Sequence, residues 1–198
     1  MPSKDGSCTT VSFDYCYTKA GEASQEPDAL VALVMVDSKT GYLGCVPMNS
    51  KNQFDFATKE IIAFCQTLGY DDVMLRCDNE PSVLQLQRLV AQARKQMGLR
   101  TQACTPSAYE HGNALAENGI QRIRGLAGSI MHGLQMKLGA TVSTSHALWT
   151  WCMRHSAWVL STYNPHQGLT AYEVVMESPT QARFVSMVNQ YLALQNHP

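Results

Sequence analysis

Along this chain, apolar side chains recur with two different periods, and each period predicts a type of element. Short blocks rich in β-branched and apolar residues predict strands. These blocks cover residues 10–18, 29–37, 42–48, 72–78 and 99–104. The block at 29–37 is almost continuously apolar, which is typical of a strand buried on both faces. The turn residues 38–41, Ser-Lys-Thr-Gly, then lead into a strand that we expect to return antiparallel.

Between and after these strands, apolar residues follow the helical period. The predicted helices cover residues 53–68, 81–97, 115–138 and 145–162. Gly69 and Gly98 stand where helix C-caps are expected, and Pro81 suits the first turn of a helix. Strands that alternate with helices after an initial meander predict an α/β domain, in which helices flank both faces of a mixed five-stranded sheet.

Composition narrows the possible functions. The chain has 198 residues, of which 45% are hydrophobic and 16% charged, so we expect one soluble globular domain. The net charge of -1 excludes an overall basic field, and any nucleic-acid contact must come from a local basic face. No apolar run approaches a membrane span and no targeting signal is seen, so we expect an intracellular protein without membrane contact. Seven dispersed cysteines without Cys-x-x-Cys spacing predict reduced core thiols.

Three carboxylates occupy positions where chemistry collects in such sheets. Asp14 lies in the middle of the first strand, Asp78 ends the fourth, and Glu117 opens the helix after the fifth. Taken singly, Asp78 could cap a helix and Glu117 could complement a helix dipole, while Asp14 is disfavoured by strand propensity. Together they can meet at one sheet edge, in the oxygen-rich arrangement that holds two divalent metals for phosphoryl transfer.

Several ordered motifs carry a resemblance to a known family. The segments "MLRCDNEPS" and "TPSAYEHGNALAENGIQRIRGL" resemble the D-N-G and T-P-x-x-x-x-x-x-N-G-x-x-E-R segments of retroviral and LTR-retrotransposon integrase catalytic cores. The segment "VALVMVDSKTGYLGCVPM" is similar to the second and third strands of that family, and "STYNPHQGLTAYEVVMESP" to its terminal segment. The resemblance places a catalytic core at residues 10–180, between a tail at 1–9 and a C-terminal helix or tail at 181–198.

This resemblance implies an RNase H-like fold and a metal-dependent polynucleotidyl transferase that processes 3′ DNA ends and transfers strands. It assigns Asp14, Asp78 and Glu117 as catalytic residues that bind two Mg²⁺ or Mn²⁺ ions. It further implies element-end and target DNA as partners, a homo-oligomer, and a location in the nucleus or a virus-like particle. No nucleophile elbow or phosphate-cradling glycine loop occurs, so we expect no small-molecule cofactor.

The same resemblance implies a DNA-binding face on the helix of Glu117. Family members contact DNA through the residues four and seven positions after the glutamate, which here are Gln121 and Arg124. Arg124 is the better phosphate ligand of the two. We add Asn113 and Arg122 to the expected DNA-binding residues, while a merely solvated helix face is the alternative.

The chain also departs from the family pattern. Between Asp78 and Glu117 lie 38 residues (117 − 78 − 1), three more than the 35 of the family. Glu80 and Ala114 stand where the family has glycine, and Asn118 follows the glutamate in place of arginine. Two alternatives therefore stay open: a non-catalytic RNase H-like module that binds DNA or protein, and an RNase H-like nuclease that cuts without joining.

Other acidic and aromatic residues have roles that must be distinguished from metal binding. We expect Asp37 to cap the turn at 38–41 and Glu80 to lie in the first turn of its helix rather than to bind metal. Glu110 is the rival of Glu117 as third carboxylate. The tryptophans at 149, 151 and 158 are expected in the core or at a subunit interface.

Overall fold

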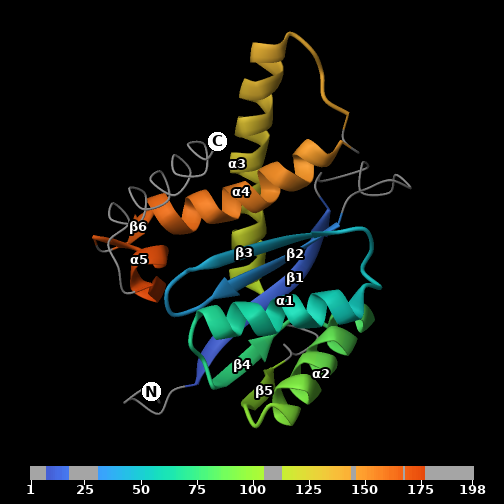
Figure 1. Ribbon diagram of the computed structural model, residues 1–198, viewed down its shortest axis with the longest axis vertical. Helices are drawn as coiled ribbons and strands as arrows, with labels where there is room; N and C mark the ends of the chain where they lie inside the picture. The colour runs from blue at the N-terminus through green and yellow to red at the C-terminus, as the bar shows by residue number, and fades with distance from the viewer. Residues whose placement is uncertain (1–7, 18–30, 105–112, 144–145, 167, 177–198) are drawn as a thin grey trace, which may run out of the picture.

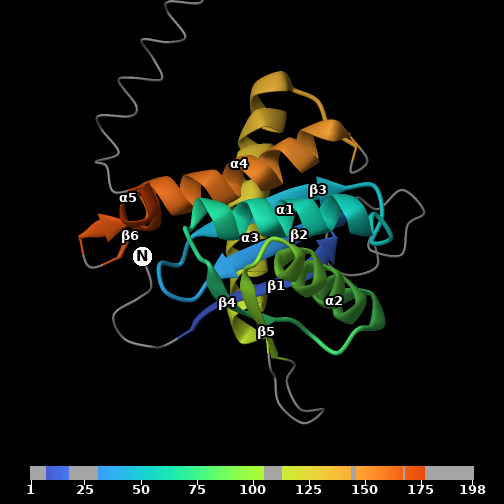
Figure 2. The same cartoon turned by 60° about the horizontal axis from the view of Figure 1, so that its bottom comes forward.

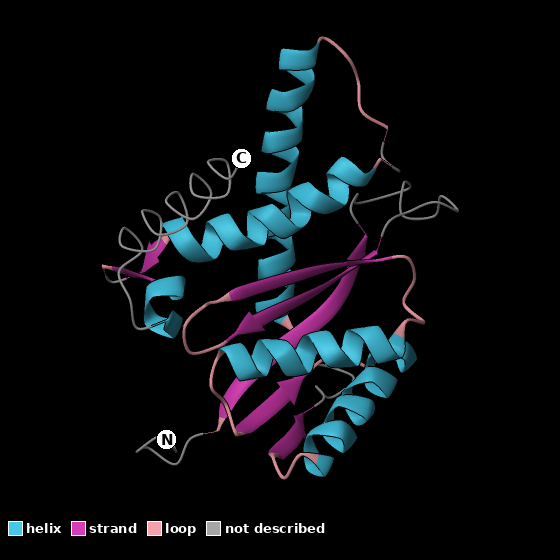
Figure 3. Ribbon diagram, in the orientation of Figure 1, coloured by secondary structure: helices cyan, strands magenta, loops and turns pink. Residues whose placement is uncertain are grey.

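Five strands form one mixed sheet at the centre of the computed structural model, which describes residues 8–17, 31–104, 113–143, 146–166 and 168–176 (Figures 1 and 3). The strands are β1 (Thr9–Tyr17), β2 (Val31–Asp37), β3 (Leu43–Met48), β4 (Asp72–Arg76) and β5 (Arg100–Cys104). Their order is β3-β2-β1-β4-β5. The first three strands form an antiparallel meander, and β4 and β5 join it in parallel. The predicted mixed five-stranded sheet is confirmed.

Helices cover both faces of the sheet (Figure 2). The helices are α1 (Phe54–Thr67), α2 (Pro81–Gln96), α3 (Ala114–Leu138), α4 (Ala147–Tyr163) and α5 (Ala171–Met176). One apolar core lies between the sheet and the α1–α2 pair, and a second lies between the sheet and the α3–α4 pair. The long helix α3 runs beyond the sheet, and α4 crosses it (Figure 1). The sheet is therefore a shared wall between two cores.

Side-chain parity on β1 decides where Asp14 points. Phe13 and Tyr15 belong to the core under α1 and α2, whereas Cys16 belongs to the core under α3 and α4. Because successive side chains on a strand face opposite sides, Asp14 shares the α3 face with Cys16. The first strand thus delivers a carboxylate to the side of the sheet on which the helix of Glu117 packs.

Most predicted boundaries lie within two residues of the observed ones. Gly69 and Gly98 adopt positive φ angles of 72° and 77° after their helices, as expected of glycine caps. His146 caps α4, since its Nδ1 accepts a hydrogen bond from the N–H of Leu148 at 3.1 Å, so the helix starts later than the predicted residue 145. The short hairpin of β6 (Pro165–His166) and β7 (Leu169–Thr170), and helix α5, were not predicted.

Two expectations drawn from composition can be compared with the structure. All seven cysteines are free thiols, and five of them are buried. In the described part of the chain, no helix combines the length and the apolar character needed to cross a lipid bilayer. The predicted tails at 1–9 and 181–198 lie wholly or almost wholly outside the described residues, so their structure stays a prediction.

Candidate active site

Asp14 and Asp78 lie side by side because β1 and β4 run parallel in register. The pairing runs from Thr9 opposite Val73 to Ser12 opposite Arg76, where β4 ends, and the same register continued two residues past that end sets Asp14 opposite Asp78. Adjacent strands are about 4.8 Å apart. Cys77 belongs to the core on the α1–α2 side, so strand parity turns Asp78, like Asp14, to the α3 side. The register thus brings two carboxylates to one edge.

Both aspartates hold their protons more tightly than usual. Burial, together with the negative charges of Asp78 and Glu80, raises the pKa of Asp14 from its ordinary value of 3.8 to about 6. Two groups act in the other direction: the N–H of Tyr15, which donates to Asp14 Oδ1 at 2.7 Å, and the ammonium of Lys51. Burial, then repulsion by Glu117 and Glu80, also raises the pKa of Asp78. The positive charge of Lys51 therefore compensates only part of the negative charge around Asp14.

The start of α3 carries Glu117 to this edge. Its carboxylate is exposed in the first helical turn and acts electrostatically on Asp78. The buried side chain of Asn113 fixes this turn, because its Nδ2 donates to the backbone oxygen of Phe13 at 3.0 Å. At Gly119 a Cβ atom would lie 2.6 Å from a methyl group of Val36, so only glycine allows so close an approach of helix and sheet.

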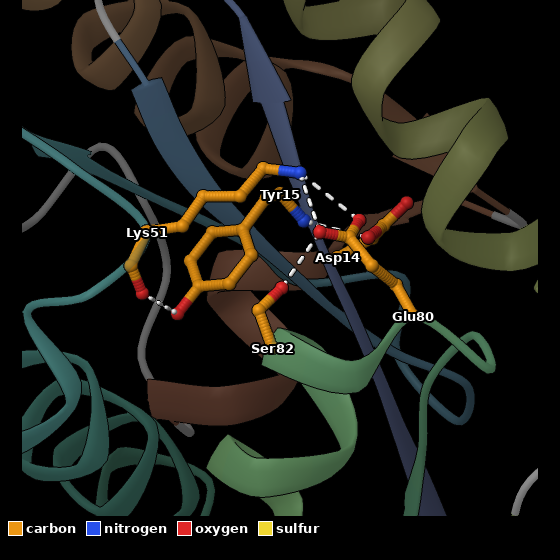
Figure 4. A network of polar contacts seen from close by, with 5 residues as sticks. All are labelled: Asp14, Tyr15, Lys51, Glu80 and Ser82. Carbon is orange, nitrogen blue, oxygen red and sulfur yellow. Dashed lines mark hydrogen bonds and ion pairs between the residues drawn. The ribbon is translucent and has the colours of Figure 1, made fainter.

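Glu80 brings a fourth carboxylate to the same edge, together with a lysine. It is the N-cap residue of α2, directly before Pro81, and so lies just before the first turn that the sequence predicted for it. Its Oε1 and Oε2 accept hydrogen bonds from Lys51 Nζ at 2.8 and 2.9 Å, and Ser82 Oγ donates to Oε1 at 2.7 Å (Figure 4). Sequence analysis missed Lys51, because no motif links it to residues 29 positions away.

Solved structures with the same architecture are retroviral integrase catalytic cores. The HTLV-2 core in complex with magnesium matches in its dimeric form (TM-score 0.55, 12% identity, 84% of this chain, 93% of that one) and in its trimeric form (0.57, 13%, 83%, 93%). The BIV core matches with a TM-score of 0.55 at 14% identity, over 88% of this chain and 97% of that one. No protein-family model and no curated protein matches the sequence. The chain has the RNase H-like fold of retroviral integrase cores.

Within this integrase-like fold, the donor atoms suit a hard divalent cation. Carboxylate oxygens are the ligands that Mg²⁺ and Mn²⁺ prefer, and a cation would relieve the repulsion that raises the pKa values of Asp14 and Asp78. Among the described residues, however, no three His, Cys, Asp or Glu side chains are grouped closely enough to hold a metal ion as they stand. Asp14 is coupled electrostatically to Asp78, and Asp78 to Glu117, and the predicted metal triad stays a prediction.

The predicted DNA-binding residues do not all lie at the surface. Gln121 and Arg122 are exposed on α3. Arg124 is half-buried, and its Nε and Nη2 donate to the backbone oxygen of Tyr17 at 3.0 and 2.6 Å, which ties α3 to the end of β1. Asn113 is fully buried. Its Nδ2 is bonded to the backbone oxygen of Phe13 beneath the helix, and its role as a DNA contact stays a prediction.

The structure describes Asp37 but not Glu110, two other acidic residues that the sequence analysis considered. Asp37 caps its turn as predicted: its Oδ2 accepts hydrogen bonds from the backbone N–H of Thr40 at 2.9 Å, the hydroxyl of Thr40 at 2.6 Å and the hydroxyl of Tyr70 at 3.1 Å. It pairs with Val11, three residues along β1 from Asp14. Glu110, the rival third carboxylate, lies outside the described residues.

The tryptophans divide between core and surface. Trp149 packs against the core beneath α4, as predicted. Trp151 is 54% exposed and stacks on His155 at 4.7 Å between ring centroids, and His155 stacks in turn on Trp158 at 5.5 Å. This aromatic row on α4, in which Trp151 is exposed and His155 and Trp158 are partly buried, agrees with the alternative expectation, a subunit interface, which stays a prediction.

Proposed function

We propose that this chain is the catalytic core of a retroelement integrase, a metal-dependent polynucleotidyl transferase that processes 3′ DNA ends and transfers strands. One observation carries the proposal: the parallel register of β1 and β4 sets Asp14 beside Asp78, and the start of α3 adds the charge of Glu117. The fold shared with the HTLV-2 and BIV integrase cores supports it.

In the proposed mechanism, Asp14, Asp78 and Glu117 hold two Mg²⁺ or Mn²⁺ ions. When bound, such ions supply activation of the attacking oxygen and stabilisation of the leaving one. The N–H of Tyr15 orients the Asp14 carboxylate by binding its Oδ1, which leaves Oδ2 available as a ligand. Asn113 and Gly119 keep the first turn of α3 against the sheet, so that Glu117 stays beside Asp78.

DNA and further copies of the chain are the proposed partners. The exposed Gln121 and Arg122 offer polar contacts along α3, and the part of the Arg124 guanidinium not bound to Tyr17 can reach a phosphate. Structures with this fold include dimeric and trimeric forms of the HTLV-2 core and an intasome of simian T-cell lymphotropic virus. Function in the nucleus or in a virus-like particle follows from the proposed activity.

A non-catalytic DNA- or protein-binding module is the second candidate. The lack of a grouped metal-ligand set in the described residues and the net charge of -1 favour it. The third alternative, a nuclease, shares the site but does not join strands.

Strand transfer with labelled duplexes that mimic element ends separates the three functions. The whole chain is incubated with Mg²⁺, with Mn²⁺, or with EDTA, and the products are resolved by length. An integrase gives products longer than the substrate in the presence of metal. Cleavage without longer products indicates the nuclease. The absence of metal-dependent chemistry with any terminal duplex indicates the module.

A further inference from the structure

Lys51 lies beside the carboxylates of Asp14 and Glu80 at the predicted catalytic edge. Lys51 lies in the connection between β3 and α1, and its ammonium is gripped by both carboxylate oxygens of Glu80, which Ser82 holds in turn. Figure 4 shows this pair next to the side chain of Asp14. Two loops that are distant in sequence therefore place one positive charge at the predicted catalytic edge.

Aromatic rings set the position of this lysine. The ammonium lies 5.8 Å from the centroid of the Tyr15 ring and 5.6 Å from that of the Tyr17 ring, within the range of a cation–π interaction. The hydroxyl of Tyr15 also donates to the backbone oxygen of Lys51 at 3.4 Å. Since Tyr15 and Tyr17 pack with the core of the α1–α2 face, Lys51 approaches Asp14 from the side opposite to Glu117. Its side chain is 25% exposed, so a ligand can reach it.

The partner that Lys51 has in this structure can be exchanged at small cost. The Glu80 side chain is 44% exposed, and ion pairs near water contribute about 0–1 kcal/mol. Lys51 lies beside the carboxylates of Asp14 and Glu80, and Asp78 and Glu117 add further negative charge to the same edge of the sheet. A polyanion that approaches this edge therefore meets Lys51 as the nearby attractive charge, provided that Glu80 releases it.

We propose that Lys51 binds a DNA backbone phosphate adjacent to the reacting one, and that Glu80 is a positioning residue that holds the ammonium until DNA replaces it. The inference rests on the proposed function, because DNA reaches Lys51 only if its backbone passes Asp14. Glu80 occupies the position at which the family pattern has glycine. The Lys51–Glu80 pair is therefore a feature of this chain and not of the family pattern.

Equilibrium DNA binding tests this assignment without any catalytic step. A fluorescent duplex is titrated with the whole chain in EDTA at several salt concentrations. The variants are Lys51→Gln, Glu80→Gln and the double variant. Arg100→Gln and Asp72→Asn serve as matched controls, because Arg100 on β5 and Asp72 on β4 form an exposed ion pair at 3.6 Å.

We expect Lys51→Gln and Glu80→Gln to change DNA affinity in opposite directions. Lys51→Gln should weaken binding about fivefold at low salt and reduce the salt slope by about one, as expected for one lost phosphate contact. Glu80→Gln should tighten binding about twofold in the wild type, because the lysine is released. In the Lys51→Gln background it should change nothing, since the gain acts through the lysine.

The outcomes separate this inference from the proposed function. A gain from Glu80→Gln that persists without Lys51 indicates simple loss of repulsion and overturns the inference. Equal effects from the Arg100 and Asp72 controls also overturn it. If the wild type binds DNA and both Lys51 variants bind equally well, only the inference fails. If the wild type binds no DNA at all, the proposed function fails with it.

Discussion

Asp14 and Asp37 lie on neighbouring strands and are both withdrawn from water, yet their surroundings differ in kind. Asp37 accepts hydrogen bonds from two groups of Thr40 and from the hydroxyl of Tyr70, so its charge is well solvated by the protein. Asp14 receives a hydrogen bond from the N–H of Tyr15 and faces the negative charges of Asp78 and Glu80. A structural carboxylate such as Asp37 is surrounded by hydrogen-bond donors. Asp14 instead lies among more negative than positive charge.

The largest expected effect concerns chemistry. On the proposed function, Asp14→Asn or Glu117→Gln should lower metal-dependent strand transfer at least about 1000-fold, because a neutral amide is a poor ligand for a hard cation. Asp37→Asn should leave the activity of the folded fraction within about threefold. Product formation per folded molecule, measured for the three variants side by side, checks this. Full activity in Glu117→Gln would remove that residue from the triad and require Glu110 to be tested in its place.

The second effect concerns stability, and here Asp37→Asn should have a larger effect than Asp14→Asn. Asp37→Asn should lower the free energy of unfolding by about 2–4 kcal/mol, because donors arranged for a buried carboxylate lose a charged acceptor. Asp14→Asn should be neutral or stabilising by up to about 1 kcal/mol, since it removes repulsion from Asp78 and Glu80. Urea unfolding in EDTA at pH 7 gives both values. Equal losses in the two variants would show that Asp14 is a structural residue after all.

The smallest effect is a pH dependence that the raised pKa of Asp14 produces. The pKa of folded Asp14 is raised from 3.8 to about 6, so between about pH 4 and 6 the folded state binds the proton that the unfolded state has released. Stability from this group is therefore greatest below about pH 4 and falls as the pH rises to about 6, and Asp78 acts in the same direction. Urea midpoints measured across this window in EDTA should fall less steeply for Asp14→Asn than for the wild type. A wild-type slope that Asp14→Asn leaves unchanged would place the titrating group elsewhere.

Much of this contrast was accessible from sequence, because it depends on local patterns. A turn signal directly after Asp37 predicted its cap, and the apolar blocks around Asp14 and before Asp78 predicted the strands that carry them. The fold of the described residues was therefore largely predictable. The structure supplied the parallel register of β1 with β4, which, continued two residues past Arg76, sets the two aspartates side by side.

Contacts that depend on packing could not be predicted. Asn113 occupies a motif position expected at the DNA surface, yet the close approach of α3 at Gly119 buries it against β1. The pairing of Lys51 with Glu80 joins two loops through tertiary packing alone, and no periodicity records it. The β6–β7 hairpin has two-residue strands, which are too short to produce a pattern.

The amide of Asn113 has a consequence for how the site opens. It joins the backbone of β1 at Phe13 to the first turn of α3, so Asp14 and Glu117 sit on two sides of a single hydrogen bond. Fraying of the first turn of α3 would break this hydrogen bond and at the same time move Glu117 away from Asp14 and Asp78. On the proposed function, cation binding at this edge is therefore coupled to a local-unfolding equilibrium, which amide hydrogen exchange at the first turn of α3 reports directly.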